Sequence, residues 1–218
     1  MRPRRPWRPS AEGVSVFKTI VIKLFVCVLV LLGNAAPVLA DGGALEALRS
    51  TIDEGIHILD DPELVGTDGW AQKEEKLWRL SERLFDYPAM SRLVLGSYWD
   101  DLTARQREAF YVAFTGFLRR AYVPRLLERY SGQRIYYDRE QIVSPSRAVV
   151  GAYVFWMERK IPFNIHMLRR QEGWKIYDIS TMGVSAVKNY RAQFRWLLLS
   201  GTLDQLIARL NTRANPAS

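Results

Sequence analysis

Hydrophobic residues recur at helical spacing through the first half of the chain. Between residues 44 and 59 one helical face carries Leu45, Leu48, Ile52, Ile56 and Leu59. Pro62 ends this helix, because proline disfavours α geometry in the residue before it. A second helix is predicted over residues 70–85, and Pro88 fits the first turn of a short third helix.

The strongest helical pattern follows residue 103. Thr103 and Gln106 form a capping-box pattern, in which each side chain satisfies a backbone amide at the start of a helix. The apolar face of this helix is predicted to carry Phe110, Ala113, Phe114, Phe117, Leu118 and Ala121. Pro124 is expected to kink or break the helix near Tyr122, because proline has no amide hydrogen and clashes with the preceding turn.

The hydrophobic period then changes from that of a helix to that of a strand. Four segments rich in β-branched and aromatic residues are predicted as strands: 134–143, 147–158, 161–170 and 174–181. Short turn-like links separate them, which favours an antiparallel meander. In the third strand Ile161, Phe163, Ile165 and Met167 fall on one face. One side of the sheet is therefore strongly apolar and must be covered.

Two further helices are predicted after the sheet, divided near Gly201, and Thr202 and Gln205 form a second capping-box pattern. Helices before and after a single meander favour an α+β fold. We therefore expect a four-stranded antiparallel sheet that is covered on one face by N- and C-terminal helices, with an apolar cavity between the layers.

Charge is concentrated at the start of the chain. The formal charge is +8, with 31 basic and 23 acidic residues. Residues 1–40 hold six of the basic residues and one acid, so the remainder carries about +3 and no nucleic-acid partner is expected. The basic start, an apolar run over residues 24–32 and a small residue at Ala40 predict a signal peptide cleaved near Ala40. The alternative is an uncleaved anchor.

The rest of the chain is expected to form a single domain over residues 41–213, with a flexible tail at 214–218. The only cysteine, Cys27, lies in the signal segment, so the mature chain has no disulfide or thiol chemistry. Neither His57 nor His166 belongs to a cluster with metal-ligand spacing, and no metal, cofactor or catalytic residue is predicted. Asp178 is unusual in mid-strand, where a structural hydrogen bond is favoured over a role as general base.

An ordered set of short motifs resembles the MlaC / Ttg2D (toluene-tolerance) family of periplasmic lipid carriers. The matching residues are Met90–Trp99, Leu102-Thr103, Gln106-Arg107, Phe110, Leu127, Tyr130–Gln133, Trp174–Ile179, Gly183–Ser185, Asn189–Arg191 and Gln193-Phe194. Two positions depart from the family pattern. Met182 replaces a common acidic residue, and Asn164-Ile165-His166 stands where Asp-Tyr-Arg is usual.

The resemblance implies a monomeric periplasmic carrier without catalysis. Such a carrier would move phospholipid, or a related membrane lipid, between an outer-membrane lipoprotein complex and an inner-membrane ABC transporter with an MCE-domain subunit. A branch of the family is associated with hopanoid-producing gene sets, so a polycyclic lipid is an alternative cargo. Direction of transport and docking surfaces stay open.

The lipid is expected between the apolar sheet face and the helix over residues 103–121. The residues predicted to contact it are Phe114, Phe117, Tyr122, Phe155, Phe163, Ile165, Met167, Ile179 and Met182, with the strand face ambiguous for Phe155 and Ile179. Two other functions stay open at this point. One is a cone-fold enzyme that uses Asp178 with Tyr177 or Tyr190 as acid and base. The other is an adaptor with a filled core.

Overall fold

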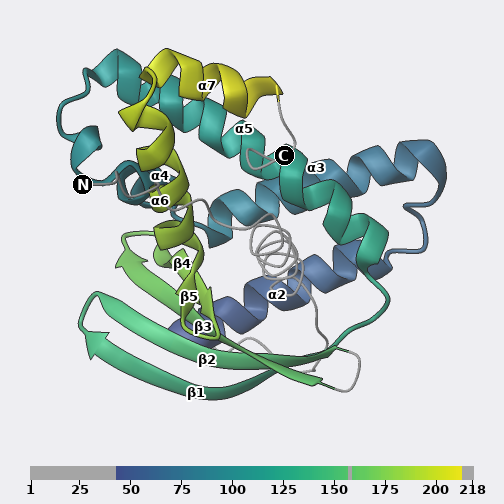
Figure 1. Ribbon diagram of the computed structural model, residues 1–218. Coiled ribbons are helices and arrows are strands. Elements are labelled where there is room, and N and C mark those ends of the chain that lie inside the picture. Colours follow the sequence, from purple (N-terminus) through teal and green to yellow (C-terminus); the bar gives the residue numbers. More distant parts are fainter. Residues whose placement is uncertain (1–42, 157–158, 213–218) are drawn as a thin grey trace, which may run out of the picture.

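The computed structural model describes residues 43–156 and 159–212 (Figure 1). Its helices are α2 (Ala44–Asp60), α3 (Gly66–Leu84), α4 (Tyr87–Leu95), the 3-10 turn η2 (Gly96–Trp99), α5 (Ala104–Arg129), α6 (Ala186–Leu199) and α7 (Leu203–Thr212). Its strands are β1 (Ile135–Ser144), β2 (Arg147–Trp156), β3 (Arg159–Arg170), β4 (Gly173–Thr181) and β5 (Val184–Ser185). The predicted signal peptide, its cleavage position near Ala40 and the tail at 214–218 lie outside the described residues.

The strands form one antiparallel sheet in the order β1-β2-β3-β4-β5, which confirms the α+β fold and the meander. The sheet has five strands instead of the four expected. The extra strand, β5, has two residues and pairs with the end of β4. Met182 and Gly183 make the turn between them with φ angles of 48° and 80°. A strand of this length shows no alternation in a sequence, and so it escaped prediction.

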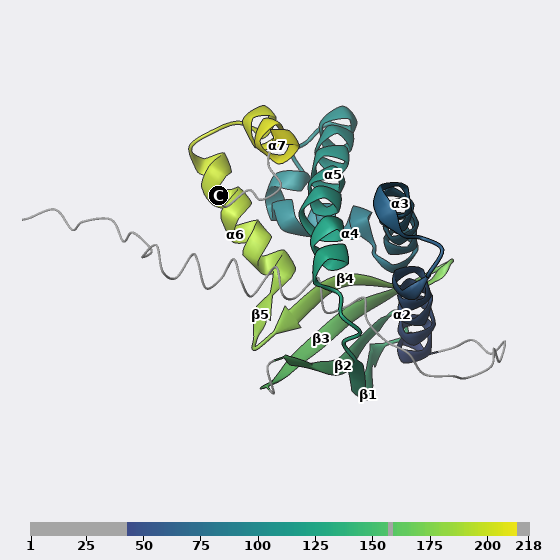
Figure 2. The ribbon, with the colours of Figure 1, turned by 90° about the vertical axis from the view of Figure 1, so that its right-hand side faces the viewer.

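Helices cover one face of the sheet and leave the other open (Figure 2). The covered face of β3 carries Phe163, Ile165 and Met167, all buried, as the alternation predicts. Helices α2, α3, α4 and α6 contact strands of the sheet, whereas α5 packs mainly on α3, α4 and α7. The hydrophobic core therefore extends from the sheet through the first helices to the aromatic face of α5.

Helix α5 begins at the predicted cap. The Thr103 amide donates to Gln106 Oε1 at 2.9 Å, and the Gln106 amide donates to Thr103 Oγ1 at 3.3 Å. The expected break at Pro124 is wrong, because α5 continues to Arg129. Arg125 Nη1 donates to the carbonyl oxygen of Ala121 at 2.7 Å, one turn earlier. Pro124 has no amide hydrogen to donate to the Arg120 carbonyl four residues earlier, and the Arg125 side chain adds a donor at the next carbonyl of the same turn.

The junction between α3 and α4 is attached to the sheet. Phe85 forms a parallel bridge with Ile176 of β4, and the Asp86 amide donates to the Ile176 carbonyl oxygen at 2.8 Å. The Asp86 carboxylate also accepts from the Ala89 amide at 2.9 Å, which caps α4. Pro88 occupies the first turn of α4, as the sequence predicts. The junction therefore has a fixed position against β4.

Candidate functional site

Seven of the nine side chains predicted to contact lipid belong to one hydrophobic core. Phe114, Phe117 and Tyr122 come from α5, Phe163, Ile165 and Met167 from β3, and Ile179 from β4. None is more than 4% exposed. The fold therefore gathers residues from three elements into one apolar region, and their contact with lipid stays a prediction.

Aromatic rings from α5 and α6 meet at the centre of this region. The Phe114 ring lies edge-on to the rings of Tyr190 and Phe194, each at a centroid distance of 5.8 Å. This geometry places the positive edge of one ring against the negative face of another. The hydroxyls of Tyr122 and Tyr190 are hydrogen-bonded to each other. Burial raises the pKa of Tyr122 to about 12, so its hydroxyl stays neutral at neutral pH.

The covered face of β2 carries only small side chains. Ala148, Val150, Ala152 and Val154 point toward the helices, and none is more than 2% exposed. Ala152 pairs in register with Phe163 of β3 and with Tyr137 of β1. Alanine and valine are smaller than Phe163, Ile165 and Met167 on the covered face of the neighbouring strand β3.

Phe155 and Met182 lie outside this core: the inward position expected of Phe155 is wrong, whereas the contact of Met182 with lipid stays a prediction. Phe155 is 52% exposed on the open face of the sheet, because Val154 takes the inward position beside it. Its ring contacts those of Tyr136 and Tyr153 at 5.8 and 5.7 Å. Met182 is 74% exposed in the turn before β5. Neither belongs to the core cluster.

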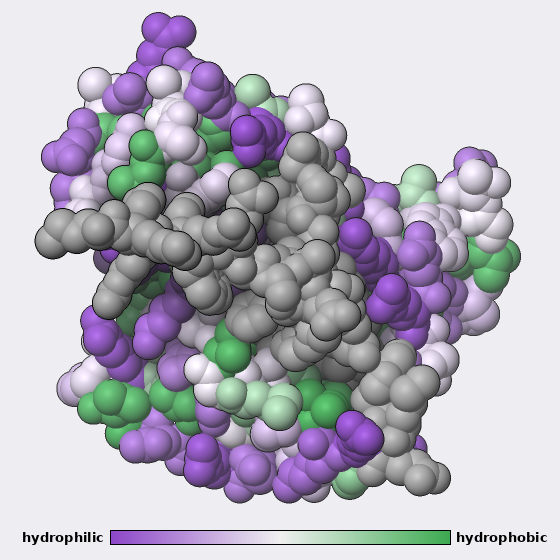
Figure 3. Space-filling view, viewed as in Figure 1, coloured by the Kyte–Doolittle hydropathy of each residue, from purple (hydrophilic) through white to green (hydrophobic). Residues whose placement is uncertain are grey.

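Four other exposed hydrophobic side chains lie near the ends of elements. Ile142 and Val143 are near the end of β1, and Trp196 and Leu199 are near the end of α6. Figure 3 shows hydrophobic residues at the left-hand end of the sheet interspersed with hydrophilic ones. Exposed apolar residues of this kind are common on protein surfaces, and by themselves they do not indicate a binding site.

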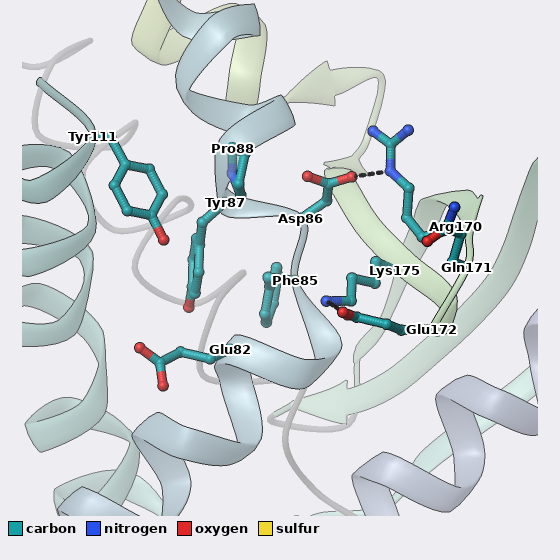
Figure 4. Close-up of a pocket in the computed structure, with 10 residues that line it drawn as sticks. All are labelled: Glu82, Phe85, Asp86, Tyr87, Pro88, Tyr111, Arg170, Gln171, Glu172 and Lys175. Atoms are coloured by element: carbon teal, nitrogen blue, oxygen red, sulfur yellow. Dashed lines mark hydrogen bonds and ion pairs between the residues drawn. The ribbon is translucent and has the colours of Figure 1, made fainter. Parts of the chain in front are cut away.

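A pocket of about 460 Å³ opens where the α3–α4 junction, α5 and the β3–β4 hairpin meet (Figure 4). It is lined by Glu82, Phe85, Asp86, Tyr87, Pro88, Tyr111, Arg170, Gln171, Glu172 and Lys175. Phe85 and Tyr87 are buried members of the hydrophobic core and stack at a centroid distance of 5.7 Å. The pocket thus combines apolar walls that continue into the core with charged groups around them.

Two ion pairs lie on the hairpin side of this pocket, and one further carboxylate lies opposite them. Arg170 Nε lies 2.6 Å from the buried Asp86 carboxylate, and Lys175 Nζ lies 2.7 Å from Glu172. Glu82 lies on the side of Tyr87 and Tyr111 in Figure 4, away from Arg170 and Lys175. Burial and then the Glu82 charge raise the pKa of Tyr111, whereas Lys175 lowers it.

Asp178 has a structural role at the start of α6. Its carboxylate accepts hydrogen bonds from the Ser185 hydroxyl and, at 3.0 Å, from the Val187 amide. Ser185 in turn accepts from the Lys188 amide at 3.0 Å. A carboxylate at a helix N-terminus is stabilised by the free amides and the helix dipole. This arrangement fits the structural hydrogen bond favoured by the sequence. Tyr190, a proposed partner in acid–base chemistry, is bonded to Tyr122 instead.

Replacing Asp178 with alanine is expected to lower the free energy of unfolding by about 2 kcal/mol, because two hydrogen bonds to a carboxylate are lost at a helix start. Urea unfolding of the purified protein measures the change. Asp101→Ala, at an exposed position before α5, is the matched control and should change stability by less than about 0.5 kcal/mol. Equal effects of the two substitutions would contradict the structural role of Asp178.

The two histidines have ordinary surroundings. His57 is exposed on α2, and His166 is half-buried with Nε2 at 3.2 Å from Ser180 Oγ. Within residues 43–156 and 159–212, no group of three or more His, Cys, Asp or Glu side chains is placed to hold a metal ion. In the same part of the chain, no helix combines the length and the apolar character needed to cross a membrane.

Sequence reasoning missed the pocket because its residues come from three distant segments. Tyr111 lies on α5 beside the predicted apolar face, and Arg170 is the last residue of β3. No local pattern connects residue 82 with residues 111 and 175. Contacts without a sequence signal bring the α3–α4 junction to the hairpin: the bridge from Phe85 to β4, the bond from the Asp86 amide to Ile176, and the Asp86–Arg170 ion pair.

Comparison with known proteins gives consistent matches. A family model described as MlaC protein matches residues 49–212. A curated relative, the intermembrane phospholipid transport system binding protein MlaC of Haemophilus influenzae, is 25% identical over 127 residues, or 56% of this chain. The matched segment spans 59% of that relative's length. A solved phospholipid-binding protein from Ralstonia solanacearum, in complex with a phospholipid, aligns with a TM-score of 0.64 at 20% identity. That alignment covers 79% of this chain and 97% of the other, and it shows the same fold.

Proposed function

The chain belongs to the MlaC family, and from that premise we propose that it is a periplasmic carrier of phospholipid. The observation that carries the proposal is the single apolar region between the covered sheet face and the aromatic residues of α5 and α6. Both similar proteins support it, because one is named for phospholipid transport and the other was solved with a phospholipid.

The physical task is to shield acyl chains from water. Each CH₂ group exposed to water costs about 0.8 kcal/mol, so two chains with roughly thirty methylenes cost on the order of 25 kcal/mol. A carrier lowers this barrier by offering apolar surroundings throughout the transfer. We place the chains between the small residues of β2 and the rings of Phe114 and Phe117, with Phe163 and Ile165 beside them.

The proposed partners are an inner-membrane ABC transporter with an MCE-domain subunit and an outer-membrane lipoprotein complex. A carrier that exchanges lipid with both must leave each of them after docking. Transfer of the lipid then depends on the difference between its free energy when bound in the carrier and its free energy when bound in the partner complex. Neither free energy alone determines the outcome. The predicted signal peptide supports a periplasmic location for this exchange.

Native purification should recover bound phospholipid. The mature chain, expressed with export and purified without detergent, is extracted with organic solvent, and the extract is analysed by mass spectrometry. We expect phospholipid at close to one molecule per protein. Absence of lipid from native preparations, together with no uptake from vesicles, would refute the carrier. A polycyclic lipid in place of phospholipid would contradict the proposed cargo.

A further inference from the structure

We propose that the pocket between the α3–α4 junction and the β3–β4 hairpin binds the head group of a zwitterionic phospholipid. The phosphate lies near Arg170 and Lys175, and the ammonium lies near Glu82. This inference rests on the proposed carrier function and adds to it the class of head group. The acyl chains of the same lipid lie in the apolar region described above.

The walls of the pocket suit the boundary between a head group and its acyl chains. Its volume of about 460 Å³ is in the range of pockets that hold small ligands. Phe85 and Tyr87 contribute to the pocket and also belong to the hydrophobic core. A glycerol backbone placed against these rings would have apolar groups on one side and charged groups on the other.

The hairpin side supplies donors for a phosphate. Arg170 uses Nε to bind Asp86, and within the described residues no hydrogen bond is seen from its two terminal nitrogens. Lys175 is held by Glu172, whose side chain is mostly exposed. Exposed ion pairs contribute little net free energy, so a phosphate oxygen can replace Glu172 at small cost. A guanidinium and an ammonium together suit a phosphate diester.

The opposite side suits an ammonium group. Glu82 is exposed, and its negative charge raises the pKa of both Tyr87 and Tyr111, after the larger effect of burial. A carboxylate beside aromatic rings is favourable for a bound cation.

The balance of charges decides which class of head group fits. The lining has three carboxylates, Glu82, Asp86 and Glu172, against the two cations Arg170 and Lys175. A purely anionic head group would therefore be repelled at Glu82. A head group with both charges satisfies both sides of the pocket.

Competition between two lipids tests this assignment. Lipid-free protein is incubated with vesicles that contain equal amounts of phosphatidylethanolamine and phosphatidylglycerol, then separated, extracted and analysed by mass spectrometry. Wild-type protein should take up more phosphatidylethanolamine. Glu82→Lys should lower the ratio of phosphatidylethanolamine to phosphatidylglycerol about fivefold, because an attraction of the size of an exposed ion pair becomes a repulsion.

Glu128→Lys is the matched control, since Glu128 is exposed on α5 outside the pocket; its ratio should equal that of wild type. An unchanged ratio in Glu82→Lys, with normal loading, overturns the head-group assignment and leaves the carrier proposal standing. Loss of lipid from every variant, wild type included, overturns both.

Soluble glycerophosphoethanolamine is added to the protein in a separate experiment, and binding is followed by amide NMR shifts. Shifts at Lys175 without any vesicle preference would identify a free ester as the ligand and overturn the lipid assignment.

Discussion

Phe114→Ala is expected to lower the free energy of unfolding by about 4 kcal/mol, the typical cost of removing a buried phenyl ring. Phe114 is fully buried and contacts the rings of Phe110, Tyr190 and Phe194. Its loss removes apolar burial and leaves a cavity between α5 and α6 that the surrounding rings are too stiff to fill. Urea unfolding of lipid-free protein measures the change, because bound lipid would add its own stabilisation.

Phe155→Ala is the matched control, since the same side chain is removed from the open face of the sheet. Phe155 is half-exposed. Among the described residues its ring contacts the rings of Tyr136 and Tyr153. Its loss should cost less than about 1 kcal/mol. If the two substitutions had similar effects, Phe114 would not be at the centre of the core.

Ala152→Phe is expected to reduce bound lipid at least tenfold while the protein stays folded. Ala152 points from β2 into the region proposed for the acyl chains. A phenyl ring there occupies volume that a chain would fill, at a cost in stability of about 1–3 kcal/mol from overpacking. Phospholipid per protein, measured after incubation with vesicles, gives the result.

Val149→Phe is the control for Ala152→Phe, because it adds an aromatic ring to the other face of the same strand. It should leave lipid uptake near the wild-type value. Near-ultraviolet circular dichroism establishes that each variant is folded, and Ala152→Val provides a smaller change at the same position. Full lipid uptake by folded Ala152→Phe would exclude chains from the space above β2.

The elements with strong periodicity could be predicted from sequence. The alternation in β3 identified its buried face, and both capping boxes, at Thr103 and at Thr202, form the expected bonds. The prediction failed where a tertiary contact outweighs a local preference. Pro124 was expected to kink or break α5; the helix is not broken, because burial of Val123 and Leu126 on either side keeps it continuous.

The candidate site was predictable only in part. Periodicity placed Phe114, Phe163 and Met167 in the core, because each lies on the apolar face of a regular element. The prediction for Phe155 failed because its strand is apolar on both faces. The pattern therefore does not show which residues point inward, and a shift of one residue moves a side chain to the opposite face of the sheet. The charged pocket could not be predicted from the sequence, because its geometry depends on a contact between the α3–α4 junction and β4.

The bridge at Phe85 protects an edge of the sheet from pairing with a strand of another copy of the protein. An open strand edge invites pairing with a strand of another molecule, which leads to aggregation. On the outer side of β4, Asp86 binds the Ile176 carbonyl, and β5 pairs with Ser180 and Thr181. The α3–α4 junction thus protects a sheet edge as well as lining a pocket. Substitutions that loosen it would lower colloidal stability in addition to any effect on ligand choice.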